Sequence, residues 1–482
     1  MDRRKLLGDT SNRIIVKLEF MKTSIFISGI SFVLAILLFS AGVLNLNSLF
    51  DYANQPIPNY ITKNNTPSNN TLDDKIATLG RVLFYDKNLS LNNSMACASC
   101  HLQEFAFSDT AQLSSGFEGG FTGRHSMRLV NARFGVETKF FWDERAANLE
   151  TQTTMPIQDH VEMGFSGTNG QPNFDSLVNK LSTISHYQTL FNFAFGSSQI
   201  TENRIQRALA QFVRSIQSFD SKFDVGLSQA ANLNANFANY TQQENLGKQL
   251  FLAPPPNGAG CQGCHRAPEF DIDPNTLNNG VVGIAGATGI DLNNTRAPSL
   301  RNLFNPSGQL NGPLMHNGVF TTINQMINHY NLIPINPQNT NLDPRLQGPG
   351  GNLQLTVNER DALIAFLRTL TGNAVYTDER WSNPFDSDGN LEVVQTTNGI
   401  EIVQDPTSVF VYPNPTTNSF SVDLKIGKYQ VSVFDLWGRL EISLKVDEVR
   451  LVDVSQLSKG SYFVLIHDLQ SPSKFRSSFI KQ

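Results

Sequence analysis

Hydrophobic positions recur at helical spacing over most of the chain. The pattern Leu-Gly-x-x-Leu-Phe begins at Leu79 and again at Leu246, each time in a helical context. Between the two copies, residues 201–223 carry apolar side chains at helical spacing, and Thr201 is a suitable N-cap. We therefore expect two related helical units bridged by a helix over 201–223.

The end of the second unit and the tail have different patterns. Thr356 and Glu359 form a capping-box pattern ahead of an apolar helical run, which predicts a helix that closes the second unit. From Val409 onward apolar residues alternate, as at Phe420 and Val422, which is typical of strands. The tail is therefore expected to be a separate, small β-sandwich.

Composition limits the classes of partner. The chain has 482 residues, which suits several domains, and only 16% of them are charged, with a formal net charge of -5. No basic face for nucleic acid is implied, so no nucleic-acid partner is expected.

The N-terminal region is typical of a secretory signal. Met21-Lys22 precedes an apolar run over 25–39, and small residues over 40–42 suit cleavage. Residues 1–20 would then be an upstream extension. A membrane anchor reaching Leu46 is the alternative.

The four cysteines carry the most specific chemistry. They form two Cys-x-x-Cys pairs, each followed at once by a histidine: Cys97, Cys100 and His101, then Cys261, Cys264 and His265. This spacing lets two thiols bond a porphyrin while the adjacent imidazole ligates its iron. A zinc ribbon would need the pairs much closer in the chain, and disulfides give no reason for either histidine. Two covalently attached c-type hemes are expected.

From about Leu79 to Leu370 the chain resembles the bacterial diheme cytochrome c peroxidase family, which includes a relative that matures a tryptophan-derived quinone cofactor. The resemblance rests on the order and spacing of several motifs. These are Cys97-Ala-Ser-Cys100-His101, Phe141-Trp142-Asp143-Glu144-Arg145-Ala146, Leu149-Glu150-x-Gln152, Pro156, Val161-Glu162-Met163-Gly164, Cys261-Gln-Gly-Cys264-His265, Pro298-Ser-Leu300-Arg301-Asn302 and His316-Asn317-Gly318.

The resemblance implies a peroxidatic heme in the first domain and an electron-receiving heme in the second. Trp142 would lie between them on the electron path. Glu162 would be the acid/base group that peroxide cleavage requires, Gln152 would orient the peroxide, and Pro156 would shape the pocket loop.

The chain departs from the family pattern near the first iron. The loop that often supplies a histidine to cap this iron reads Gly-Phe-Glu-Gly-Gly over 116–120 and has no histidine. His125 stands where the family usually has a calcium-binding asparagine, and is either a surface or interface residue or a heme ligand. Calcium is therefore doubtful, although Asn311 and the carbonyl of Pro313 could still contribute oxygen ligands.

A second departure concerns the distal ligand of the second iron. Well-studied members have a methionine fourteen positions after the histidine of the His-x-Gly block, and this chain has Tyr330 there. Tyrosine at this place resembles the cofactor-maturing relative, and a phenolate favours oxidised iron. Met315 and His329 are nearby alternatives.

The tail resembles the sorting domain of type IX secretion. The similar motifs are Tyr412-Pro413-Asn414-Pro415-Thr416, Val433-Phe434-Asp435-x-x-Gly438-Arg439, Leu457-x-x-Gly460-x-Tyr462 and a basic end at Lys481. Export through the periplasm to the cell surface or medium is implied, with the secretion machinery as a partner.

The expected fold is mainly α, with two c-type cytochrome domains followed by a small all-β sandwich. The expected segments are 1–42 (extension and signal peptide), 43–72 (linker), 73–225 (peroxidatic domain), 226–382 (electron-transfer domain), 383–408 (linker) and 409–482 (sorting domain). The expected activity is reduction of hydrogen peroxide with electrons from a small donor protein. Oxidation of a protein or organic substrate, and non-catalytic electron transfer, are the alternatives.

Overall fold

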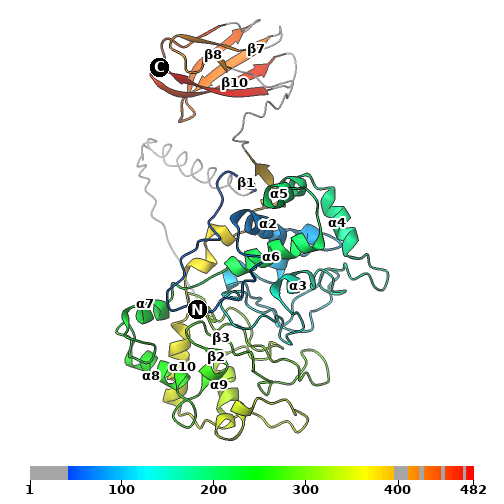
Figure 1. Ribbon diagram of the computed structural model, residues 1–482, viewed down its shortest axis with the longest axis vertical. Coiled ribbons are helices and arrows are strands. Elements are labelled where there is room, and N and C mark those ends of the chain that lie inside the picture. The colour runs from blue at the N-terminus through cyan, green and yellow to red at the C-terminus, as the bar shows by residue number, and fades with distance from the viewer. Residues whose placement is uncertain (1–41, 396–410, 423–427, 447–450, 470–473) are drawn as a thin grey trace, which may run out of the picture. The chain divides into compact units, whose positions relative to one another are not determined.

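The computed structural model describes residues 42–395, 411–422, 428–446, 451–469 and 474–482 (Figure 1). The chain divides into two compact units, with the boundary between Gln395 and Thr396. The first unit contains helices joined by long irregular segments, and the second contains strands. The apolar run over 25–39 lies outside the described residues. Among those residues, no helix is long and apolar enough to cross a membrane.

The helices of the first unit follow the chain in a simple order. They are α2 (Asp74–Tyr85), α3 (Leu149–Thr154), α4 (Phe174–Ser182), α5 (Ser185–Phe195), α6 (Glu202–Ser215), α7 (Lys222–Gln229), α8 (Gln242–Leu252), α9 (Ile323–Asn331) and α10 (Val357–Arg368). Two short strands, β2 (His265–Arg266) and β3 (Asp271–Ile272), form one small ladder.

A first hydrophobic core lies where α2 crosses α6. Gly80 allows the close approach, because a Cβ atom there would lie 2.0 Å from the carbonyl oxygen of Ala208. Asp73 caps α2 by accepting from the amides of Lys75 and Ile76. The Leu-Gly motif thus places a glycine at the helix crossing.

A second core repeats this arrangement between α8 and α10. A Cβ atom on Gly247 would lie 1.8 Å from the carbonyl oxygen of Ala362. The predicted capping box is present, since the Thr356 amide donates to Glu359 and the Glu359 amide donates to the Thr356 hydroxyl. The internal repeat is therefore a repeat of structure as well as of sequence.

The bridging helix is shorter than the prediction of 201–223. The helix α6 ends at Ser215, and α7 begins at Lys222. Asn131 explains the break, because its amide donates to the Ile216 carbonyl and its side chain pairs with the backbone of Ser218. A side chain from elsewhere in the chain thus replaces the hydrogen bonds that would continue the helix.

The segments expected to be linkers pack against the first core. Strand β1 (Val43–Asn45) pairs in parallel with β4 (Glu392–Val394). Tyr52 and Phe385, one from each of these segments, are buried in the same core. The chain on both sides of the heme-motif region is therefore part of the first unit.

The second unit is a small β-sandwich with a single hydrophobic core. One sheet has the order β11-β10-β7-β8, and the other has the order β5-β6-β9. The strands are β5 (Val411–Tyr412), β6 (Ser419–Val422), β7 (Tyr429–Phe434), β8 (Leu440–Val446), β9 (Val452–Asp453), β10 (Gly460–Asp468) and β11 (Lys474–Lys481). Alternate residues such as Phe420, Val431 and Val433 are buried, as the period-two pattern predicts.

Candidate functional site

A cavity of about 640 Å³ lies beside the first Cys-x-x-Cys-His motif. Interiors are normally close-packed, so a space of this size indicates a site for a ligand. The four predicted catalytic residues all line it together with the motif: Cys97, Cys100, His101, Trp142, Gln152, Pro156 and Glu162. Residues that lie up to 65 positions apart in the sequence therefore meet in one cavity.

The imidazole of His101 is oriented by the backbone. Its Nδ1 lies 3.2 Å from the carbonyl oxygen of Phe107, to which it can donate. Phe107 has a left-handed φ of 58°, which belongs to the turn that presents this carbonyl. With Nδ1 as donor, Nε2 is left with a lone pair for a metal ion.

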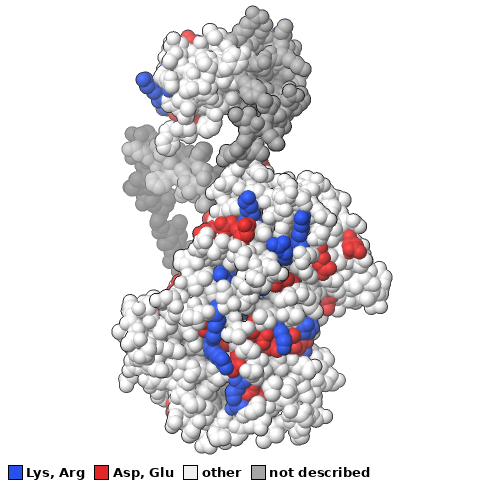
Figure 2. Space-filling view, in the orientation of Figure 1, with Lys and Arg blue, Asp and Glu red and all other residues white. Residues whose placement is uncertain are grey.

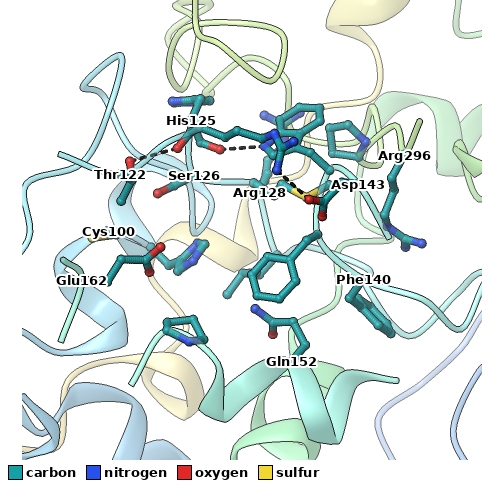
Figure 3. A pocket seen from close by; sticks show the side chains of 18 of the residues that line it. Cys100, Thr122, His125, Ser126, Arg128, Phe140, Asp143, Gln152, Glu162 and Arg296 are labelled. Carbon is teal, nitrogen blue, oxygen red and sulfur yellow. Dashed lines mark hydrogen bonds and ion pairs between the residues drawn. The ribbon is translucent and has the colours of Figure 1, made fainter. Parts of the chain in front are cut away.

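The backbone of Glu162 is held by two hydrogen bonds while its carboxyl group faces the cavity. Its amide donates to Asp159, and its carbonyl accepts from the amide of Phe117. Within the described residues, no hydrogen bond reaches the carboxylate oxygens. Figure 3 shows this carboxyl group and the Gln152 amide pointing into the same space from different sides.

Burial changes the acidity of Glu162. Burial, together with the nearby carboxylate of Asp159, raises the pKa of this carboxyl group to about 7, although the guanidinium of Arg145 opposes both effects. A carboxyl group with a pKa near neutrality can both accept and return a proton at physiological pH.

A second, smaller cavity adjoins the first at Glu162. It has a volume of about 310 Å³ and shares most of its lining with the large cavity: Phe141, Arg145, Pro156, Asp159 and Glu162. The guanidinium of Arg145 lies over the Phe141 ring, 3.7 Å from its centroid, and pairs with Asp143. Glu162 therefore lies on the walls of both cavities.

Trp142 lies on the walls of both large cavities. Its indole Nε1 donates to the carbonyl of His125 at 2.7 Å. Its own carbonyl accepts from the amides of Thr295 and Arg296, at 2.9 and 3.0 Å. Trp142 is therefore fixed by backbone contacts from both halves of the first unit.

The second Cys-x-x-Cys-His motif lines a separate cavity of about 610 Å³. Cys261, Cys264 and His265 lie on its wall, with Met315 and Tyr330. The Nδ1 atom of His265 is buried and has no hydrogen-bond partner within the described part of the chain. Burial lowers the pKa of His265 to about 4, so its imidazole is neutral at physiological pH.

The three alternatives for the distal ligand of the second iron differ in whether they line this cavity. Tyr330 and Met315 both line the cavity, whereas His329 does not. The Nε2 atom of His329 pairs with the carbonyl of Asn279 at 2.9 Å, and its ring is buried. Burial raises the pKa of Tyr330 well above its ordinary value.

The loop over 116–120 turns away from the first cavity, since none of its residues lines it. The ring of Phe117 instead packs against Gly164, and the loop backbone lies against Val161. His125 lines both large cavities, and its Nδ1 pairs with the carbonyl of Ala111 at 3.0 Å.

Asn311, which could have contributed an oxygen ligand to a calcium site, is fully buried. Its amide nitrogen donates to the Asn302 carbonyl and the Tyr376 hydroxyl, while Oδ1 has no partner among the described residues. In that part of the chain, no group of three or more His, Cys, Asp or Glu side chains could hold a metal ion.

Sequence reasoning missed Arg128. Its guanidinium lines both large cavities and donates only to the carbonyls of Arg301 and Ser299, without a carboxylate partner in the described residues. Burial lowers its pKa to about 10.

The residues present fit two hemes. Each cavity has the volume of a sizeable planar ligand, two free thiols and a neutral imidazole on one wall. The thiols of one motif do not line the cavity of the other, so one shared zinc site is not formed.

Comparison with known proteins agrees with this geometry. Over 322 residues the chain is 30% identical to the methylamine utilization protein MauG of Methylophilus methylotrophus, which covers 64% of this chain and 86% of the relative. The family model Di-haem cytochrome c peroxidase matches residues 74–232. The chain belongs to the diheme cytochrome c peroxidase family.

Two further relatives agree with the family. The cytochrome c551 peroxidase of Nitrosomonas europaea is 27% identical over 364 residues, covering 73% of this chain and 93% of that protein. The crystal structure of a MauG-like protein associated with microbial copper homeostasis has a TM-score of 0.57 and 29% identity, over 69% of this chain and 99% of that one. Heme is therefore the cofactor that the family implies.

The tail has its own match. The family model Secretion system C-terminal sorting domain matches residues 410–481, which include the whole described β-sandwich. This family member therefore carries an address for export to the cell surface.

Proposed function

We propose that this protein is an exported diheme c-type cytochrome that reduces hydrogen peroxide to water with electrons from an external donor, such as a small cytochrome. Two covalently attached hemes would occupy two cytochrome domains built on the first and second cores. The reaction consumes one peroxide, two electrons and two protons and yields two waters. Bound heme supplies the iron site and the one-electron redox chemistry.

The observation that carries the proposal is the meeting of Glu162 and Gln152 in the cavity of the first motif. Glu162 would take a proton from one peroxide oxygen and return it to the leaving oxygen. The Gln152 amide would donate a hydrogen bond that orients the peroxide. Pro156 lies between the small and large cavities and would shape the approach. Electron transfer alone would require none of these groups.

The electron path would run from the second cavity to the first through Trp142, which lies on both walls. The donor protein would approach the second half of the first unit, around α8 to α10. Figure 2 shows mostly uncharged surface on this part, crossed along its middle by a row of Lys and Arg side chains.

Oxidation of a protein or organic substrate is the second candidate. It is favoured by Tyr330 in the second cavity, because a phenolate ligand stabilises oxidised iron. The two candidates differ in what consumes the oxidising equivalents. Passage through the periplasm before surface export would suit both.

The test uses purified holoprotein with peroxide and several electron donors. A pyridine hemochrome assay should give two covalent hemes per chain. Peroxide turnover should follow, and Glu162→Gln should slow it by about 10²- to 10⁴-fold, as is typical for loss of a general acid/base group. Glu118→Gln is the control, since Glu118 is an exposed glutamate. One heme or none, or equal rates in both variants, would refute the proposal.

A further inference from the structure

One side-chain amide contacts both residues of the second cavity that could be the distal heme ligand. The Nδ2 atom of Asn279 lies 3.4 Å from the Met315 sulfur and 3.2 Å from the Tyr330 hydroxyl. An amide nitrogen carries two hydrogens, so Asn279 can donate to both atoms at once. The thioether and the phenol are therefore held beside each other.

The orientation of Asn279 is set by its other contacts. Its Oδ1 accepts from the amide of Val281 at 3.1 Å, which leaves Nδ2 toward the cavity. Its carbonyl pairs with Nε2 of His329 at 2.9 Å. The amide is thus a fixed donor between two candidate ligands.

Met315 has an unusual backbone for its residue type. Its φ is 70°, in the left-handed region that non-glycine residues rarely adopt. A tight turn holds this conformation, because the Gly318 amide donates to the Met315 carbonyl and Leu314 pairs with Phe320. Such local strain persists where the surrounding structure requires one side-chain direction, and here the side chain lines the cavity.

We infer that Met315 is a second, exchangeable distal ligand of the heme iron in this cavity: Tyr330 oxygen binds the oxidised iron and Met315 sulfur binds the reduced iron. The inference rests on the proposed heme occupancy of the second cavity. The phenolate is a hard, anionic ligand that stabilises oxidised iron, whereas the soft, neutral thioether favours the reduced state.

The exchange balances as a one-electron, one-proton step. The electron from the donor reduces the iron, the iron–oxygen bond to Tyr330 breaks, and its phenolate oxygen takes one proton from water. The iron–sulfur bond to Met315 then forms. Asn279 keeps a hydrogen bond to whichever side chain is released, so neither polar atom is left unpaired in the cavity. Oxidation reverses each change.

The experiment compares the fully oxidised and fully reduced diheme protein by visible absorption and resonance Raman spectroscopy. Reduced protein should have a six-coordinate second heme. Met315→Leu should make that heme five-coordinate when reduced and leave its oxidised spectrum unchanged. Tyr330→Phe should give the oxidised form a sulfur-to-iron charge-transfer band. Met326→Leu is the matched control, because Met326 lines the same cavity.

A measurement on the unaltered protein covers a variant that does not fold. Rapid reoxidation should pass through a short-lived ferric species with the sulfur-to-iron band before Tyr330 returns. The inference is overturned if Met315→Leu leaves the reduced spectrum unchanged, if it alters both redox states equally, or if reoxidation shows no such species. None of these spectra uses peroxide, so a protein that exchanges ligands without peroxide turnover would refute only the proposed peroxidase function.

Discussion

The indole nitrogen of Trp142 donates to the backbone carbonyl of His125, and the backbone amide of His125 donates to the carbonyl of His316. These contacts link the indole between the two cavities to the His-x-Gly turn of the second half. The ring of His316 also lies edge-on to the indole, with centroids 6.4 Å apart. The position of Trp142 is therefore set by both halves together.

Trp142→Phe should slow electron exchange between the hemes while leaving two hemes bound. The substitution removes a large conjugated ring from the shared wall and leaves the His125 carbonyl without its donor, which costs about 1–3 kcal/mol of stability. Stopped-flow reduction by a donor measures the effect as delayed reduction of the first heme. Trp437→Phe, at a 92% exposed position of the sorting domain, is the control. Unchanged exchange rates would remove Trp142 from the path.

Fully oxidised protein should react with peroxide without prior reduction. No residue of the loop over 116–120 lines the first cavity, so this loop offers no side chain to close the iron. Stopped-flow mixing of oxidised protein with peroxide should give a prompt spectral change. Inertness until one heme is reduced would contradict this expectation, and His125 would then be the first candidate for a capping ligand.

The rate of peroxide reaction should fall as the pH drops below about 7. Burial raises the pKa of Glu162 to about 7, so the carboxyl group becomes protonated there and can no longer accept the peroxide proton. The limiting slope of kcat/KM is about tenfold per pH unit. Asp159 and Arg145 are the charged groups that act on Glu162, and both line the small cavity with it.

Two substitutions should move this acid limb, the fall in rate at low pH, in opposite directions. Asp159→Asn removes a negative charge but keeps an oxygen that can accept from the Glu162 amide, so it should lower the pKa and shift the limb to lower pH. Arg145→Gln removes a positive charge and should shift it to higher pH. Shifts in the same direction would show that Glu162 does not govern the limb.

Gly80→Ala should destabilise the first unit. The added Cβ atom would lie 2.0 Å from the carbonyl oxygen of Ala208, so α2 and α6 would have to separate. Overpacking of this kind costs about 1–3 kcal/mol or more. Gly283→Ala is the matched control, because its nearest neighbour lies at 3.6 Å. Thermal unfolding compares the stability of the two variants. Equal losses of stability would argue against a close contact between α2 and α6 at Gly80.

A chain that ends at Gln395 should keep both hemes and peroxide turnover but should not reach the cell surface. The unit boundary falls at that residue, and residues 410–481 match the sorting-domain family. Fractionation of cells and heme staining would follow the truncated protein. Mass measurement of the full-length protein from the cell surface should show that its tail has been removed. A truncated chain at the surface would refute the role of the tail.

Much of this protein was determined by short stretches of sequence. Cys97, Cys100 and His101 lie within five residues, so the chemistry of heme attachment depends on local spacing alone. The capping box at Thr356 is also local, because its partner Glu359 lies three residues later. Alternation in the tail is likewise local, because a strand needs only its own period to bury one face.

Other properties depended on residues brought together from distant positions. The end of α6 at Ser215 follows from Asn131, and the burial of Tyr52 follows from a segment that returns more than three hundred residues later. The pKa of Glu162 depends on cavity walls that no local pattern encodes. Tyr330 and Met315 line the second cavity, whereas His329 does not. Contacts with Asn279 set these orientations, because its side chain donates to Met315 and Tyr330 and its carbonyl pairs with His329.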